Sequence, residues 1–427
     1  MNEHRVPETM QRALPSDMRA LALNGVGWEH LHVTRAPVPR PGPGQLLARV
    51  DAAGICTSML KLIEQGPAHN LVYGWDVSRW PLILGDEGAV TLVEVGEALQ
   101  GAYHVGERYA VQPAVEHPPI NHRERYRDGG RGITKIAAGY TLPGLLAEYI
   151  LIPEEILAVG CLLPLPDAAL AYAHVAVSEP LSCVVSAQDH HLHLIREGPT
   201  EPRSVIKGLK PGGVTVVIGV GAMGRMHVEV AMSYRPRAIL CADLIEERLE
   251  LVRRLFAARA EQAGILLRTV NAGHEEVRDV ISALTDHQGA DDVIIAVGSA
   301  GAIAAGMGYI GRGAVLNLFG GLQKGQEMVG FDTGVIHYKE INVTGSSGGF
   351  AWDICRTLEM LADGSLDAAA HITRIGDLEH APELLQMVKA QQIDGKAVVY
   401  PHRRTDRIRV VPAWTAADER AYLRDAA

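Results

Sequence analysis

One stretch of the chain, VTVVIGVGAMG at residues 214–224, limits the possible folds more than any other. Its apolar part, Val214 to Ile218, is rich in β-branched residues, as in a strand buried on both faces of a parallel sheet. The glycines that follow have G-x-G-x-x-G spacing, which allows a tight turn, a close approach of a pyrophosphate to the backbone, and close packing of the next helix. The free N–H groups of that helix start also favour a pyrophosphate. The candidate cofactor contacts in this turn are Gly219, Gly221, Ala222, Met223 and Gly224.

The residues after the turn complete a dinucleotide-binding unit. A helical pattern is followed by a second apolar run, 238–242, which ends on Asp243. This acid follows Gly219 by 24 residues, close to the spacing of about 20 expected for a carboxylate that binds the ribose hydroxyls. Its charge would repel the 2′-phosphate of NADP, so we expect NAD, although the nearby Arg248 leaves NADP open. The alternative is a βαβ unit that binds no cofactor.

Further strands are expected at 293–297, 314–319 and 341–344, and most of them end at glycines such as Gly298, where a ligand can meet the carboxyl ends of the strands. The alternation of helices and strands predicts a doubly wound parallel sheet over residues 178–345. The insertion at 190–211, with three histidines in HHLHL, is expected to be a helix plus a loop. We expect its histidines to form a solvated face rather than a metal site, because no acid or thiol lies at ligand spacing.

Composition limits the class of protein. A chain of 427 residues is expected to form two domains, and no apolar run approaches the ~20 residues of a membrane span. The start of the chain lacks the apolar segment of a signal peptide. A net charge of −10 argues against nucleic acid or an anionic membrane as a partner. The five cysteines include no C-x-x-C pair, so we expect a reducing, cytoplasmic location.

The chain before the glycine turn has a different character. Residues 18–55 and 82–152 contain short strand patterns with Pro/Gly turns, which indicate a β-rich domain, and a helix is expected to begin near Thr57. From Trp352 the chain should return to this domain and end in a strand near DGKAVVYP and a charged tail. The expected domains are therefore residues 1–177 with 346–427, and residues 178–345.

Several blocks, in order, resemble the medium-chain dehydrogenase/reductase superfamily of zinc-dependent alcohol and polyol dehydrogenases. The blocks span roughly residues 18–400 and are AGICTSMLK, ILGDEGAVTLVEVG, AEYILIP, SEPLSC and the glycine turn. Within the superfamily the chain looks most like L-sorbose 1-phosphate reductase-like proteins, through EPLSCVV, GYTLP, VLNLFGG and GSSGG. The resemblance implies an α/β protein in which a Rossmann domain is inserted into a β-rich GroES-like catalytic domain.

The resemblance also implies a catalytic zinc site. It places the ligand roles on Cys56, Asp86 and Glu179, with Glu87 as a ligand or near-ligand. The G-H-E of the family is here Gly85-Asp86-Glu87, so a carboxylate replaces the imidazole ligand. Oxygen donors favour harder ions such as Mn²⁺, but carboxylates also bind zinc, and zinc remains the expected metal. The alternative is a relic site without metal, in which Cys56 packs as a small apolar residue.

Other residues carry roles by the same resemblance. Ser58 matches the hydroxyl that passes the substrate proton, and Lys61 can continue that relay, neutralise a substrate phosphate, or simply be an exposed helix lysine. The structural zinc lobe of the superfamily is excluded, because no cysteine lies between Cys56 and Cys161. The corresponding stretch, 116–135, carries several arginines that either bind a substrate phosphate or form a solvated surface.

The expected activity is NAD-dependent hydride transfer between nicotinamide and a polyol, keto-sugar or sugar phosphate, assisted by a divalent metal. The resemblance further implies a homo-oligomer, either a dimer or a tetramer. Two alternatives remain open: a metal-free reductase of the same fold, and a protein that binds the dinucleotide without turnover.

Overall fold

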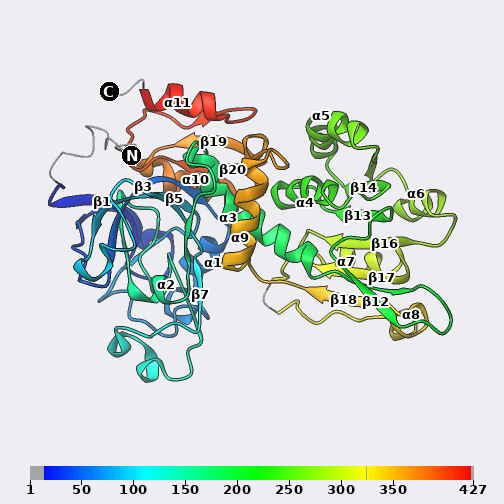
Figure 1. The fold of residues 1–427 in the computed structure, drawn as a ribbon, viewed down its shortest axis with the longest axis horizontal. Coiled ribbons are helices and arrows are strands. Elements are labelled where there is room, and N and C mark those ends of the chain that lie inside the picture. Colours follow the sequence, from blue (N-terminus) through cyan, green and yellow to red (C-terminus); the bar gives the residue numbers. More distant parts are fainter. Residues whose placement is uncertain (1–13, 324, 425–427) are drawn as a thin grey trace. The chain divides into compact units, whose positions relative to one another are not determined.

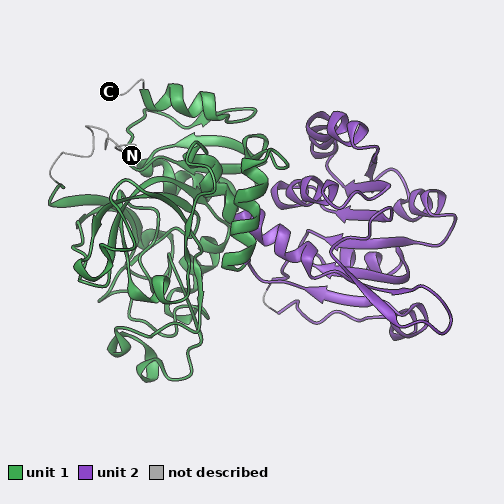
Figure 2. Cartoon of the chain, in the orientation of Figure 1, with its two compact units in different colours: residues 1–179, 350–427 green, residues 180–349 purple. Residues whose placement is uncertain are grey.

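The computed structural model describes residues 14–323 and 325–424 (Figure 1). The chain divides into two compact units, residues 1–179 with 350–427 and residues 180–349 (Figure 2), and the division falls within helix α3 (Tyr172–Asp189). None of the helices in the described ranges is long and apolar enough to cross a membrane.

The first unit is built mainly of strands, as the Pro/Gly-punctuated patterns predict. Its strands are β1 (Asp17–Leu23), β2 (Leu31–Pro37), β3 (Leu46–Ile55), β4 (Leu82–Ile83), β5 (Gly88–Val95), β6 (Arg108–Val111), β7 (Ala114–Glu116), β8 (Lys135–Ala137), β9 (Tyr149–Ile152), β10 (Leu162–Pro164), β19 (Ile372–Gly376), β20 (Lys396–Val399) and β21 (Arg409–Val410). Its other helices are α1 (Ser58–Gln65), α2 (Glu154–Ala158), α9 (Ala351–Ala362), α10 (Ala381–Lys389) and α11 (Ala416–Arg424).

One sheet of this unit places residues that are far apart in the sequence. Its order is β10-β6-β5-β3-β20-β19-β21, with β9 also paired to β3. Strand β3 runs antiparallel to both β5 and β20, with Ala53 opposite Gly88 and Ile55 opposite Ala397. The end of β3 therefore meets the starts of β5 and β20 at one edge of the sheet.

The second unit is a doubly wound α/β sheet. Its strands are β11 (Leu192–Arg196), β12 (Arg203–Lys207), β13 (Val214–Ile218), β14 (Ala238–Asp243), β15 (Leu266–Asn271), β16 (Ala290–Ile295), β17 (Ile310–Leu318) and β18 (Asn342–Gly345). Its other helices are α4 (Ala222–Met232), α5 (Glu246–Gln262), α6 (Val277–Leu284), α7 (Ala300–Met307) and α8 (Thr333–Lys339). Six parallel strands follow the order β15-β14-β13-β16-β17-β18, so the topology reverses beside β13, where such sheets bind ligands.

Strand β13 is buried on both faces, as its nearly continuous run of β-branched residues predicts. Val216 packs into a core that also contains Ile281 of α6, while the next residue, Val217, packs into a second core that contains Leu249 of α5. Successive side chains of a strand point to opposite faces, so the two cores lie on the two sides of the sheet.

The prediction for residues 190–211 is wrong. In place of a helix plus a loop, β11 and β12 form an antiparallel hairpin. His191 and His193 are buried at 0% and 2% exposure rather than solvated, whereas Leu192 and Leu194 face outward at 47% and 57%. Buried and exposed residues alternate along β11, as in a strand, but the histidines face inward and the leucines outward. A hydropathy pattern assigns these residues to the opposite faces.

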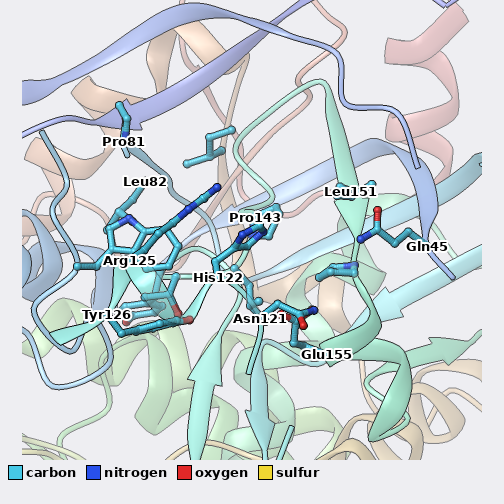
Figure 3. Close-up of a pocket in the computed structure, with 16 residues that line it drawn as sticks. Gln45, Pro81, Leu82, Asn121, His122, Arg125, Tyr126, Pro143, Leu151 and Glu155 are labelled. Carbon is cyan, nitrogen blue, oxygen red and sulfur yellow. The ribbon is translucent and has the colours of Figure 1, made fainter. Parts of the chain in front are cut away.

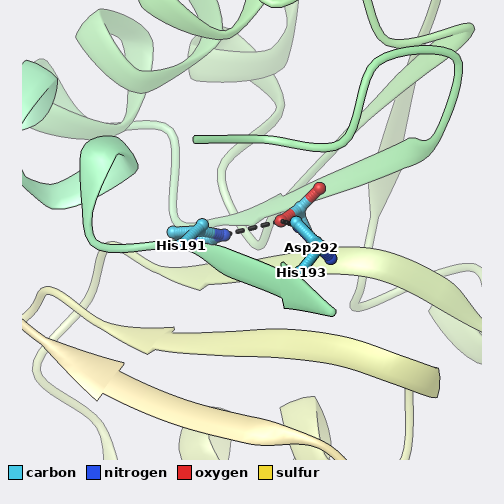
Figure 4. Close-up of side chains that lie close together, drawn as sticks. All are labelled: His191, His193 and Asp292. Carbon is cyan, nitrogen blue, oxygen red and sulfur yellow. Dashed lines mark hydrogen bonds and ion pairs between the residues drawn. The ribbon is translucent and has the colours of Figure 1, made fainter. Parts of the chain in front are cut away.

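Both histidines bind one buried carboxylate, that of Asp292 in strand β16 (Figure 4). His191 Nδ1 and His193 Nε2 lie 2.6 and 2.9 Å from Asp292 Oδ1, and the Lys210 amide donates to Asp292 Oδ2 at 2.9 Å. Burial alone would raise the pKa of Asp292, but the bonds from the two histidines outweigh it and lower the pKa to about 2.

Asp292→Asn should destabilise the protein by about 2 kcal/mol at pH 7, because a carboxyl pKa lowered from 3.8 to about 2 represents that much stabilisation of the folded state. This stabilisation is present above pH 3.8 and is lost as the pH falls towards 2. Urea unfolding at neutral and acidic pH measures it. Equal stability of the two proteins at pH 7 would contradict the assigned role.

Candidate functional site

The glycine turn has the local geometry that a pyrophosphate site needs. Gly219 adopts a φ of +84°, a conformation that favours glycine, and a Cβ atom on Gly224 would lie 1.9 Å from the Gly219 carbonyl oxygen. A Cβ on Gly221, the residue that precedes α4, would meet only the Arg248 guanidinium, at 3.9 Å. The backbone at the start of α4 is therefore open to a ligand on that side.

Asp243 lies at the end of β14 and binds the turn directly. Its Oδ2 accepts the Val220 amide at 2.8 Å, and its Oδ1 accepts the Ile245 amide at 3.0 Å. The Arg248 Nη1 atom is 3.8 Å from the same carboxylate. The structure thus brings the predicted ribose acid and the glycine turn together, and it also places Arg248 beside both.

Gly298 follows β16, the strand on the other side of β13. A Cβ atom there would approach the Gly321 carbonyl oxygen to 2.5 Å, so the position requires a residue without a side chain. The predicted glycines therefore follow adjacent strands of the sheet, at the carboxyl ends where doubly wound folds bind ligands.

A second group of predicted residues gathers at the sheet edge of the first unit. Cys56 follows β3, while Asp86 and Glu87 precede β5. One ligand atom from each of these three residues lies within 4.8 Å of the others. Gly54 makes room for this arrangement, because a Cβ atom there would lie 2.0 Å from Glu87 Oε2.

Each acid of this cluster uses one oxygen and leaves one without a partner. Ser58 Oγ donates to Asp86 Oδ2 at 2.5 Å, and Lys396 Nζ donates to Glu87 Oε1 at 2.6 Å. Asp86 Oδ1 and Glu87 Oε2 are buried and have no hydrogen-bond partner within the described part of the chain. Two orphaned carboxylate oxygens beside a thiol are a donor set that fits a divalent cation.

Lys396, the first residue of β20, is a member of the cluster that sequence reasoning missed. Its side chain is 8% exposed, and its ammonium also donates to the Ile55 carbonyl oxygen at 3.2 Å. Burial lowers the pKa of Lys396, but the Glu87 and Cys56 charges outweigh it, so the net pKa is raised and the lysine remains charged. The available signal was a lysine at the start of an otherwise apolar strand, KAVV.

The same electrostatics act on the other members. Burial and the charges of Asp86 and Glu87 raise the pKa of the Cys56 thiol well above its ordinary value, and Glu179 adds to this effect. Burial and then Glu87 raise the pKa of Asp86 to about 6, against the opposing hydrogen bond from Ser58. The cluster therefore strongly favours the binding of positive charge.

Two predicted residues stand outside the tight group. Glu179, in α3, does not belong to the set within 4.8 Å, although its charge acts on both Cys56 and Lys396. Lys61 is exposed on α1, and its charge acts on His69. Proximity in sequence to Ser58 did not bring Lys61 into the buried cluster, because α1 turns that position to the surface.

Tyr140 connects the cluster to a cavity of about 280 Å³. The lining residues of this cavity are drawn in Figure 3. The Tyr140 hydroxyl hydrogen-bonds to Ser58, and Tyr140 is among the residues that line the cavity. The lining also includes Asn121, His122 and Arg125 from the arginine-bearing loop. Of the arginines in that loop, Arg125 thus lines a cavity that adjoins the cluster through one tyrosine.

The histidine cluster of the other unit is a weaker metal candidate. His191, His193 and Asp292 also offer three ligand atoms within 4.8 Å. Their separations of 2.6 and 2.9 Å are those of hydrogen bonds, whereas ligands of a tetrahedral zinc lie about 3.3 Å apart. This arrangement is a hydrogen-bonded anchor for the hairpin.

Comparison with known proteins identifies the class. The family model for a zinc-binding dehydrogenase matches residues 222–363, and that for an alcohol dehydrogenase GroES-like domain matches residues 42–167. The chain belongs to the medium-chain dehydrogenase/reductase superfamily, a group of oxidoreductases, and it has the expected combination of a GroES-like domain and a doubly wound sheet.

Individual relatives are distant but cover most of the chain. Mannitol-1-phosphate 5-dehydrogenase of Aliivibrio fischeri is 28% identical over 88% of this chain and 85% of its own length. L-sorbose 1-phosphate reductase of Klebsiella pneumoniae is 27% identical over 89% of this chain and 87% of its own. A zinc-binding dehydrogenase from Sinorhizobium meliloti 1021, bound to NADP, has a similar fold, with a TM-score of 0.70 and 23% identity over 91% of this chain and all of its own.

Lys396→Met should destabilise the protein by about 3 kcal/mol, because it leaves the Glu87 carboxylate buried without its partner. Lys389→Met is the matched control, since it breaks an exposed ion pair with Glu64 and should cost less than about 1 kcal/mol. Chemical unfolding of the three proteins tests this difference. Equal costs for the two variants would show that the buried pair has no special role.

Proposed function

We propose that this protein is an NAD-dependent oxidoreductase that transfers hydride between nicotinamide and a polyol, keto-sugar or sugar phosphate, with the help of a divalent metal. The observation that carries the proposal is the pair of buried, unpartnered oxygens, Asp86 Oδ1 and Glu87 Oε2, beside the Cys56 thiol. These two oxygens and the thiol form one donor set, and a divalent cation would give both oxygens the partner that they lack.

Cys56, Asp86 and Glu87 would hold the metal, and Glu179 would contribute as a further ligand or by its charge alone. Lys396 offsets one of the four negative charges of this set. A bound divalent cation supplies polarisation of a carbonyl or alkoxide oxygen. We expect zinc, with a harder ion such as Mn²⁺ as the alternative, because Asp86 replaces the imidazole of the family.

Ser58 is positioned to carry the substrate proton. Its hydroxyl donates to Asp86 Oδ2 at 2.5 Å and hydrogen-bonds to Tyr140 at the wall of the cavity. In the absence of a cation, burial and then Glu87 raise the pKa of Asp86 to about 6, so a divalent ion that binds there would displace a proton and leave the carboxylate to accept the Ser58 hydroxyl. The Ser58 hydroxyl and the Tyr140 phenol would thus form a short proton path from the cluster to the cavity.

The substrate class is supported by the relatives and by the cavity. Two relatives that cover most of the chain carry names that specify phosphorylated polyols or sugars. Arg125 lines the cavity that adjoins the cluster through Tyr140, and a guanidinium suits a phosphate ester. We therefore favour a sugar phosphate over an unphosphorylated polyol.

Two variants distinguish the metal-binding role of Asp86 from the proton-carrying role of Ser58. Protein purified without chelator should contain about one divalent ion per chain. Asp86→Asn should reduce this content, whereas Ser58→Ala should keep the ion and lower turnover by about 10²-fold or more, the usual contribution of a positioned proton carrier. Thr57→Ala is the control, because it removes an exposed neighbouring hydroxyl with no capping bond.

Metal analysis and dinucleotide reduction assays with sugar phosphates and polyols make these measurements. Turnover without metal would support the metal-free reductase. Dinucleotide binding with no turnover on any substrate of this class would support the non-catalytic alternative. Either result would overturn metal-assisted hydride transfer.

For the cofactor, Asp243→Asn should weaken discrimination against NADP by about tenfold, because it removes the charge that repels a 2′-phosphate and leaves Arg248 nearby. An asparagine oxygen can still accept one of the two backbone bonds. Glu247→Gln, an equal change of charge at an exposed position of α5, is the control. Binding of NAD and NADP measures the ratio, and unchanged selectivity would mean that Asp243 is not the ribose acid.

A further inference from the structure

A basic turn near the end of the chain lines a large open cavity in the first unit. The turn, RRTDRIR at residues 403–409, leads from β20 towards β21. With Tyr422 of α11 it lines a cavity of about 790 Å³, whose charged lining residues are Arg403, Arg404, Asp406, Arg407 and Arg409. Four arginines against one aspartate stand out in a chain whose net charge is −10.

An aromatic cluster holds two of these arginines in place. The Arg403 and Arg409 guanidiniums lie 4.7 and 4.8 Å from the centre of the Tyr422 ring. Tyr422 is 2% exposed, and its ring packs against those of Tyr400 and Trp414. The distances between ring centres are 5.2 Å to Tyr400 and 5.6 Å to Trp414. The two cations are therefore preorganised by a buried side chain rather than spread over solvent.

The positive charge of the cavity is only partly neutralised. Arg404 pairs with Glu379 at 2.6 Å, and the Thr405 amide donates to Asp377 Oδ2 at 2.8 Å. Arg403, Arg407 and Arg409 have no ion pair with a carboxylate among the residues that the structure describes. The Thr405 hydroxyl oxygen is buried and likewise lacks a hydrogen-bond partner within the described ranges. Three arginines without a carboxylate partner and a threonine with an unpartnered hydroxyl thus line one cavity.

We propose that this cavity binds a small phosphorylated anion, such as a polyphosphate or a phosphorylated metabolite, at a site separate from the cysteine–carboxylate cluster. Guanidinium groups match phosphate oxygens with paired N–H donors, and the Thr405 hydroxyl adds a neutral donor. The volume is that of a small-molecule site. The strongly negative net charge of the whole chain disfavours a nucleic acid as the ligand. The proposal does not depend on the proposed dehydrogenase activity.

Calorimetric titration of the full chain with inorganic pyrophosphate tests the site. Arg407→Ala/Arg409→Ala should weaken binding by about tenfold or more, since it removes two charge-assisted contacts. Arg35→Ala/Arg40→Ala removes the same charge from exposed positions of the same unit and should leave the affinity within about twofold. Any binding at the glycine turn is common to all variants, so the difference between the two pairs reports on the arginine cavity.

Thr405→Val distinguishes a shaped site from general attraction, because it keeps the charge and the volume. It should weaken pyrophosphate binding about threefold, whereas long-range electrostatics alone predicts no change. Thermal unfolding confirms that each variant is folded, and the valine variant keeps the test valid if the arginine pair is unstable. The proposal is overturned by the absence of saturable binding, by equal losses in both arginine pairs, or by tighter binding of a poly-glutamate peptide than of pyrophosphate.

Discussion

The buried ion pair between Glu87 and Lys396 is the interaction on which the candidate metal cluster depends. A carboxylate at 0% side-chain exposure is costly unless a cation compensates it, and Lys396 Nζ does so at 2.6 Å while it also binds the end of β3. The lysine satisfies one oxygen of Glu87 and leaves the other free to face Cys56 and Asp86. Lys396, the first residue of β20, thus makes it possible to bury several acids together at this edge of the sheet.

The two units divide the chemistry between them. In the doubly wound unit, Asp243 accepts the Val220 amide of the glycine turn and the Ile245 amide before α5, so this acid holds the turn in shape. In the β-rich unit, Ser58 and Tyr140 link the acid cluster to a cavity. Membership of the dehydrogenase superfamily agrees with the fold of both units.

Sequence patterns predicted the elements around each site better than the insertions between them. Strand β13, the turn and helix α4 follow from an apolar run and three glycines, and β14 ends on the acid at Asp243 as expected. The hairpin at 192–207 was missed because inward-facing histidines read as polar surface, although Asp292, about a hundred residues away, satisfies both. The role of Lys396 was also missed, because its partner Glu87 is 309 positions away in the sequence.

What the sequence determined by itself was local: the strand–turn–helix unit, the spacing of its acid, the order of the motifs, and a candidate thiol and three carboxylates. These features depend on the spacing of apolar residues and on the conformations open to glycine, and both act between residues close together in the sequence. Only the tertiary structure decided which of those groups meet, that Lys61 is exposed while Lys396 is buried, and that four arginines share a cavity with Tyr422. Such encounters depend on the register of paired strands and on the packing of distant segments, and neither is written in the pattern of any single stretch.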